Sequence, residues 1–228
     1  KGTAYYVLLS VPLQIVFSFC IALMLNSNIK GKSVFRTIFY LPTIVPAVAS
    51  SIVWMMMFDP DTGFLNTLLK AAGLPASKWI YGESTAIPSL ALMSLWTVGG
   101  TVVIFLAGLQ NVPKELYEAV DVDGGGWFSK LKAVTIPMVS PTIFFNLVMS
   151  FISSFQVFSQ AYIMTSGGPN NATLFYVYYM YREAFQYGNI GVASALGWIL
   201  FVIILVLTML VFRSSALWVF YDGEVKNK

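Results

Sequence analysis

The sequence contains no histidine and only one cysteine, Cys20, and 10% of its 228 residues are charged. Histidine is the commonest general base and metal ligand, so its absence removes the simplest route to acid–base or metal chemistry. A single cysteine cannot form a disulfide within the chain. A soluble domain carries about 25% charged residues, so the low charge indicates a membrane protein. The net charge of +3 is too small and too scattered to favour nucleic acid as a partner.

The apolar residues that dominate the composition are gathered into five long stretches. An α-helix rises about 1.5 Å per residue, so roughly 20 apolar residues cross the hydrocarbon core of a bilayer. We therefore predict an all-α integral membrane protein, a single domain over residues 1–228 with five transmembrane helices. The predicted spans cover residues 4–25, 34–58, 86–110, 138–164 and 190–212. Pro12 should kink the first span, and Pro42 and Pro46 should bend the second.

The polar connection at 59–85 carries apolar residues at helical spacing, Phe64, Leu65, Leu68 and Leu69. This pattern, with the following aromatic residues, predicts a short helix on the membrane surface.

The basic residues indicate how the chain is oriented. With five alternating spans, nine of the thirteen lysines and arginines share a face with the polar segment 111–137, and four lie on the opposite face. The nine are Lys30, Lys32, Arg36, Lys114, Lys130, Lys132, Arg213, Lys226 and Lys228; the four are Lys1, Lys70, Lys78 and Arg182. Loops rich in lysine and arginine remain in the cytoplasm, so we expect segment 111–137 to be cytoplasmic and the N-terminus outside.

The central parts of the spans carry neutral polar residues and no Asp, Glu, Lys or Arg. Intramembrane charges mark ion paths and charged substrates, so their absence disfavours an ion-coupled carrier. Hydroxyl and amide groups beside aromatic rings suit a neutral polyol such as a sugar, although Ser and Thr can instead bond to their own helix or pack helices together. The candidate pathway residues are Trp96, Thr97, Gly100, Thr101, Asn146, Ser150, Ser153, Ser154, Phe155 and Gln156.

Segment 111–137 has the features of a helix, a glycine turn and a second short helix. Pro113 fits a helix start, and Gly124 to Gly126 should end the helix, because glycine readily adopts the left-handed turn. A second helix is expected over 127–136, with Pro137 where the chain enters the membrane. Leu116, Ala119 and Val120 would form the buried side of the first helix.

Glu118-Ala119-Val120, followed by Gly124 and then Ile136-Pro137, resembles the EAA loop of permease subunits of binding-protein-dependent ABC importers. The segments 105–110, 167–169 and 184–185 are similar to the carbohydrate branch, the maltose-permease-like subunits. The loop departs from the family pattern at three positions. Val120 occupies the position of the second Ala, Gly125 that of the Ala that usually follows the glycine, and Leu131 a position where Phe is common.

The resemblance implies a multi-pass protein of a bacterial or archaeal cytoplasmic (inner) membrane, surrounded by lipid. The family core has six spans, so we expect the first to precede Lys1. The implied partners are a second homologous permease subunit, an ABC ATPase dimer and an extracytoplasmic sugar-binding protein. The loop would dock on the ATPase as a cytoplasmic coupling helix, with Leu116, Glu118, Ala119, Val120, Asp123 and Gly124 as the coupling residues.

The chain has no phosphate-binding loop, so ATP and Mg²⁺ are expected on the partner ATPase, with no cofactor or metal bound here and no enzymatic activity of its own. The implied function is ATP-driven import of a sugar or oligosaccharide by alternating access. The alternatives are import of glycerol-phosphate or another small solute, a secondary carrier or channel, and a membrane-embedded enzyme.

Overall fold

The computed structural model describes residues 1–27 and 30–220, so Lys226 and Lys228 lie outside the described residues. Three helices are long and apolar enough to cross a membrane singly: α1 (Gly2–Asn26), the continuous helix Trp127–Phe155, and α11 (Ile190–Trp218). Two bent pairs of helices bring the possible spans to five. The predicted all-α membrane architecture is therefore confirmed, and the five predicted spans correspond to the three single helices and the two bent pairs. Pro12 lies inside α1.

The second span bends sharply, as predicted. Helices α2 (Lys32–Ile44) and α3 (Ala47–Met57) meet at 102°, with Pro46 immediately before α3, while Pro42 stays inside α2. The third span also bends, which its sequence does not predict. It consists of α5 (Ala86–Ser94), the 3₁₀ turn η2 (Leu95–Thr97) and α6 (Gly99–Gln110), with a bend of 54°.

The fourth span differs from its predicted bounds of 138–164. Helix α8 (Trp127–Lys130), the π-helical turn η3 (Leu131–Thr135) and α9 (Ile136–Phe155) form one helix, so the expected separate helix at 127–136 is wrong. In the π turn the Ile136 N–H donates to the Leu131 carbonyl, and this wider turn makes room for the Pro137 ring without a break. The helix then ends at Phe155, before the predicted limit.

Two apolar clusters hold the bundle together at its opposite ends. One joins α1, α6 and α9 through buried residues that include Ala22, Phe105 and Val139. The other includes Tyr6, Phe58 and Phe175, and it lies beside the short elements η4 (Ala161–Thr165), α10 (Tyr176–Tyr181) and η5 (Arg182–Gln186). Helix α11 lies against α9 and leaves most of its surface exposed.

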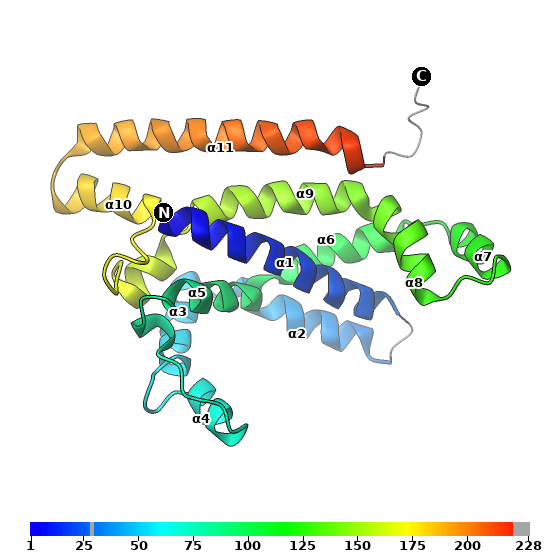
Figure 1. Ribbon diagram of the computed structural model, residues 1–228, viewed down its shortest axis with the longest axis horizontal. Coiled ribbons are helices and arrows are strands. Elements are labelled where there is room, and N and C mark those ends of the chain that lie inside the picture. The colour runs from blue at the N-terminus through cyan, green and yellow to red at the C-terminus, as the bar shows by residue number, and fades with distance from the viewer. Residues whose placement is uncertain (28–29, 221–228) are drawn as a thin grey trace.

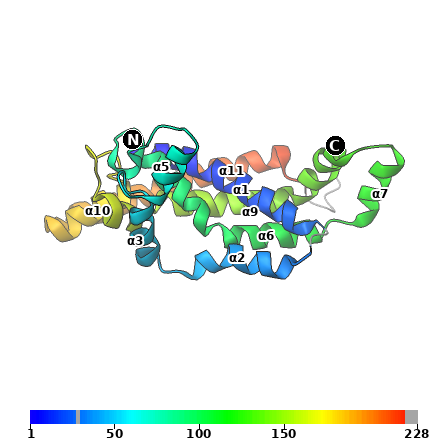
Figure 2. The same ribbon diagram turned by 90° about the horizontal axis from the view of Figure 1, so that it is seen from below.

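The two ends of the bundle carry different connections. Helix α7 (Lys114–Val122), the start of α2 and the end of α11 lie at one end in both views (Figure 1, Figure 2). The N-terminus, α3, α4 (Phe64–Ala71) and α10 lie at the other. The segments that the lysine and arginine count assigned to one face thus share one end.

The predicted helix in 59–85 is present as α4, and a buried asparagine fixes it to the turn η1 (Trp79–Tyr81). The Asn66 amide nitrogen donates to the carbonyl oxygens of Pro60 and Ser77, at 2.8 and 2.9 Å. Its oxygen accepts from the Ser77 N–H and the Trp79 indole, at 3.0 and 2.8 Å. One side chain therefore satisfies all four of its hydrogen bonds and holds the segment closed.

Candidate functional site: a polar cavity and the loop helix

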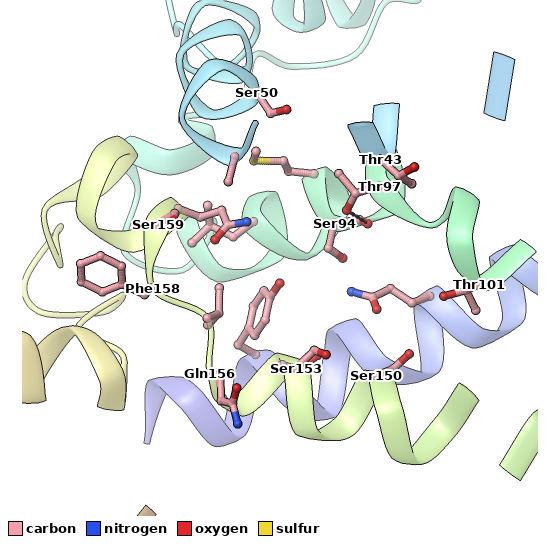
Figure 3. Close-up of a pocket in the computed structure, with 18 of the residues that line it drawn as sticks. Thr43, Ser50, Ser94, Thr97, Thr101, Ser150, Ser153, Gln156, Phe158 and Ser159 are labelled. Carbon is pink, nitrogen blue, oxygen red and sulfur yellow. Dashed lines mark hydrogen bonds between the residues drawn. The ribbon is translucent and has the colours of Figure 1, made fainter. Parts of the chain in front are cut away.

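A cavity of about 610 Å³ lies where the two bent spans meet α1 and the end of α9. Its wall includes residues on both sides of the α2–α3 bend, residues at the α5–α6 bend, and the segment 156–160 that follows α9. Figure 3 shows Ser50 of α3 on one side of the cavity and Ser150 and Ser153 of α9 on the opposite side. In membranes, irregular backbone is tolerated where it lines a cavity or is buried in protein, and that is where these breaks are.

The cavity wall is polar but uncharged. The hydroxyl and amide side chains on it are those of Tyr6, Gln14, Thr43, Ser50, Ser94, Thr97, Thr101, Ser150, Ser153, Ser154, Gln156, Ser159 and Gln160. The wall contains no Asp, Glu, Lys or Arg among the described residues. Phe158 adds an aromatic ring, and it stacks on Tyr162 with the ring centroids 5.3 Å apart. Such a wall can offer many neutral hydrogen bonds and no ion pair.

Ser50 is the one cavity residue with a fully buried hydroxyl that has no hydrogen-bond partner within the described part of the chain. The residue is only 4% exposed, so a missing partner is costly unless water or a ligand supplies one. Some other hydroxyls of the wall are bonded to a carbonyl of the preceding turn: the Ser94 hydroxyl, for example, donates to the Ala91 carbonyl at 2.6 Å. Ser50 is therefore the side chain of the wall with the greatest need for a partner inside the cavity.

The second feature of interest is the helix α7, which begins after Pro113 and ends in a glycine turn. The Gly125 N–H donates to the Val120 carbonyl at 2.8 Å, and the Gly124 N–H donates to the Asp121 carbonyl at 3.0 Å. This pair of bonds is a Schellman motif, which requires a left-handed residue after the helix. Gly124 supplies that conformation with φ of +74°.

Helix α7 has one face against its own chain and one face free. Tyr117 and Val120 pack on the α1–α6–α9 cluster, and the Tyr117 hydroxyl lies 3.2 Å from Thr135 Oγ1. Lys130 of α8 forms an ion pair with Asp121 at 2.6 Å. Leu116, Glu118, Ala119 and Asp123 are exposed. Glu115 and Val122 are exposed as well, so the side of α7 that does not pack on the bundle carries both apolar and acidic side chains.

The family described as "Binding-protein-dependent transport system inner membrane component" matches residues 14–219 of this sequence. The chain belongs to this family. The permease is 41% identical to the "Probable ABC transporter permease protein YesP" of Bacillus subtilis over 228 residues, which cover 98% of this chain and 74% of that protein. It is 33% identical to the "Arabinooligosaccharides transport system permease protein AraP" of Halalkalibacterium halodurans, covering 92% of this chain and 67% of the relative.

A solved structure has the same fold. It is the "bacterial alginate ABC transporter in complex with alginate pentasaccharide-bound periplasmic protein", with a TM-score of 0.83 at 24% identity, covering 94% of the permease and 76% of that chain. The permease is accordingly an ABC-importer subunit, and permease subunits of this kind are not themselves enzymes.

Six of the ten candidate pathway residues line the cavity of the permease: Thr97, Thr101, Ser150, Ser153, Ser154 and Gln156. The other four lie outside its wall. Trp96 is 48% exposed and packs edge-on against Trp54. Asn146 is 2% exposed and donates to the Thr142 carbonyl at 3.0 Å, so it bonds to its own helix.

The remaining two residues outside the wall are Gly100 and Phe155. A Cβ at Gly100 would meet nothing within 4 Å, and Phe155 packs edge-on against Phe151 with the ring centroids 5.0 Å apart.

The sequence reasoning missed the cavity residues of the first two spans of the permease, above all Gln14 and Ser50. Gln14 could have been found, because it is the only amide side chain within predicted span 4–25. Ser50 carries no such signal, since a serine in an apolar helix commonly bonds to its own backbone. Of the six coupling residues, Val120 packs inward, and Leu116 and Ala119 face outward on a separate side of α7.

Proposed function

We propose that the permease forms part of the path of an ATP-driven importer for a neutral sugar or oligosaccharide. The observation that supports this most is the uncharged, hydroxyl- and amide-lined cavity at the junction of two bent spans and the end of α9. Sites near the middle of transporters are often built from discontinuous helices. The names of the relatives agree with a saccharide cargo, since one transports arabinooligosaccharides and the structural neighbour transports alginate. Alginate is an acidic polysaccharide, so the neutrality of the cargo rests on the cavity wall alone.

The alternative of a phosphorylated cargo such as glycerol-phosphate is less well supported. A phosphate group taken out of water needs arginine, lysine or aligned backbone N–H groups to replace its hydration. The cavity wall has no cationic side chain among the described residues, so this subunit would offer a phosphate little stabilisation. A neutral polyol needs no counter-charge and uses the hydroxyl and amide groups that are present.

The coupling part of the proposal concerns α7. We propose that its free face docks on a separate ATPase subunit at the cytoplasmic face, that Glu118 makes a charged contact there, and that Gly124 fixes the turn. A second permease subunit completes the path, and an extracytoplasmic binding protein delivers the cargo. ATP-driven closure of the ATPase pair would then displace α7 and, through the α1–α6–α9 cluster on which Tyr117 and Val120 pack, change the bundle around the cavity.

The pathway assignment can be tested with Gln156→Leu and Ser153→Ala in the reconstituted transporter, with Ser215→Ala on α11 as control. Each cavity variant loses a hydrogen bond to the cargo that is worth about 0.5–1.5 kcal/mol, or roughly two- to tenfold in apparent sugar affinity. The measurement is sugar-stimulated ATP hydrolysis against sugar concentration. Unchanged affinity in both cavity variants would remove these residues from the path.

The coupling assignment is tested separately with Glu118→Lys, using Glu115→Lys on the same helix as the matched charge change. We expect Glu118→Lys to abolish transport or release the ATPase while the spans still insert, and Glu115→Lys to keep most of the activity. Normal transport by Glu118→Lys would exclude the charged contact. The purified chain alone should neither hydrolyse ATP nor move sugar, and solo transport would favour the secondary-carrier alternative.

A further inference from the structure

A second cavity, of about 500 Å³, lies beside α7 at the opposite end of the bundle from α10. It is enclosed by the last turn of α1, the end of α6, α7 and the α8–η3 helix. Most of its wall is apolar and includes Leu23, Met24, Leu109 and Leu131. Tyr117 of α7 and Lys130 of α8 also line it. Each takes part in a contact that holds α7 in place, Tyr117 with Thr135 and Lys130 with Asp121.

One ammonium group lines this mostly apolar cavity, and a second is hydrogen-bonded to a residue of its wall. Lys130 lines it directly, and its Nζ lies 2.6 Å from Asp121 Oδ1. Lys32 donates to the Asn26 carbonyl at 3.4 Å, and Asn26 is part of the cavity wall. Among the described residues, no carboxylate lines the cavity. The charge at the edge is therefore complementary to an anion, whereas the interior is complementary to a hydrocarbon chain.

An exposed apolar stripe on α1 leads from the middle of the bundle to this cavity. It consists of Leu13, Val16, Phe17, Cys20 and Met24, which recur at the spacing of a single helix face. From Leu13 to Met24 the stripe is about 16 Å long at 1.5 Å per residue. That is roughly half of the 30 Å hydrocarbon core, the depth that an acyl chain of one leaflet covers.

We infer that this cavity binds one anionic glycerophospholipid, with its phosphate between Lys130 and Lys32 and an acyl chain along the α1 stripe. The phosphate competes with Asp121 for the Lys130 ammonium. Occupancy by lipid therefore weakens the ion pair that ties α7 to α8. The binding site does not depend on the proposed function, but its effect on ATP use rests on α7 being the coupling helix.

The single cysteine of the chain gives a direct test, because Cys20 lies on the stripe and in the cavity wall. The assembled transporter is placed in nanodiscs of phosphatidylcholine alone or mixed with phosphatidylglycerol. The rate of Cys20 alkylation by N-ethylmaleimide is then followed by mass spectrometry of its peptide. We expect phosphatidylglycerol to slow alkylation at least threefold. Inorganic phosphate added to phosphatidylcholine discs should leave the rate unchanged.

Substitutions of Lys130 and of Asp121, the two members of the ion pair, should change the lipid protection of Cys20 in opposite directions. Lys130→Gln and Lys32→Gln should abolish the lipid effect, and Lys70→Gln, on α4 at the other end, should preserve it. Asp121→Asn frees Lys130 for the lipid, so it should strengthen protection of Cys20. If the ion pair mattered only for local structure, Asp121→Asn and Lys130→Gln would change the alkylation rate in the same direction.

Three results would overturn the inference. Cys20 could react equally fast in both lipid mixtures, it could be unreactive in both because a second permease subunit covers the stripe, or inorganic phosphate could protect it. Loss of the lipid effect with sugar transport intact would leave the proposed function standing.

Discussion

Gly125→Ala should destabilise the turn that ends α7, and the cost should depend on the residue at position 120. A Cβ at Gly125 would lie 2.5 Å from Val120 Cγ1, 3.0 Å from the Val120 carbonyl oxygen and 3.2 Å from Ser129 Cβ. Valine is stiff at χ1 in a helix, so its methyl group cannot simply turn away. Overpacking of this kind costs about 1–3 kcal/mol, which is roughly a 5- to 150-fold change in a local opening equilibrium.

The magnitude is best measured as a double-mutant cycle of Gly125→Ala and Val120→Ala. Val120→Ala alone should cost roughly 1 kcal/mol through lost contact with the α1–α6–α9 cluster. In the Val120→Ala background the nearest contact is gone, so Gly125→Ala should cost less, with only the contacts to the residue-120 carbonyl oxygen at 3.0 Å and to Ser129 Cβ at 3.2 Å remaining. The coupling energy between the two sites should therefore be at least about 1 kcal/mol. Hydrogen exchange of the amides in residues 113–126 reports the free energy of local opening in the assembled transporter.

Gly124 supplies the matched control. A Cβ there would meet nothing within 4 Å, but the residue has φ of +74°. Gly124→Ala should thus cost about 1–2 kcal/mol through backbone strain alone, by the same amount with valine or alanine at position 120. If Gly125→Ala costs the same in both backgrounds, the contact with Val120 does not explain why glycine stands there. If the cycle behaves as expected, a single contact accounts for two of the three departures of this loop from the family pattern, those at positions 120 and 125.

Three further outcomes follow from contacts elsewhere in the chain. Gly99→Ala should destabilise the bundle by several kcal/mol, because a Cβ there would lie 2.3 Å from the Phe39 carbonyl oxygen. Gly100→Ala should be tolerated, because a Cβ there would meet nothing within 4 Å. The melting temperature of the purified complex distinguishes the two variants. Asn66→Ala should leave buried donors and acceptors unpaired, cost about 1–3 kcal/mol, and expose the 59–85 segment to protease. The pKa of Asp59 is lowered by hydrogen bonds from the Thr62 N–H and hydroxyl and from the Asp61 N–H. The contribution of Asp59 to stability is therefore present above the ordinary aspartate pKa and is lost as the pH falls below about 4. Asp59→Asn should remove this pH dependence from the thermal stability of the 59–85 segment.

The number and approximate place of the spans could be predicted, because length and apolarity alone decide whether a segment can cross a bilayer. The bend at Pro46 could be predicted for a similar reason, since proline breaks the hydrogen-bond ladder locally. The bend before α6 could not, because it depends on a distant contact: Gly99 permits α2 to approach through Phe39. The end of the fourth span at Phe155 was also missed, since residues 156–158 contain neither glycine nor proline.

The residues of the candidate site could also be predicted only in part. Polarity in the third and fourth spans identified Thr97, Thr101 and Gln156, and all three line the cavity. Asn146 has the same chemistry but is used within its own helix. Only the packing of neighbouring helices distinguishes the two cases, and a single sequence does not contain that information.

The bends and the helix end around the cavity have a mechanical consequence. Helix α1 runs past the cavity without a break, and α11 is also continuous, while the second and third spans bend at the cavity wall and α9 ends there. A bent pair of helices transmits a displacement along its axis poorly, because the two helices rotate relative to each other at the bend. A displacement of α7 should therefore change the angles of α3 and η4 relative to α1, which keeps its position. The cavity volume then changes although the length of each helix stays the same.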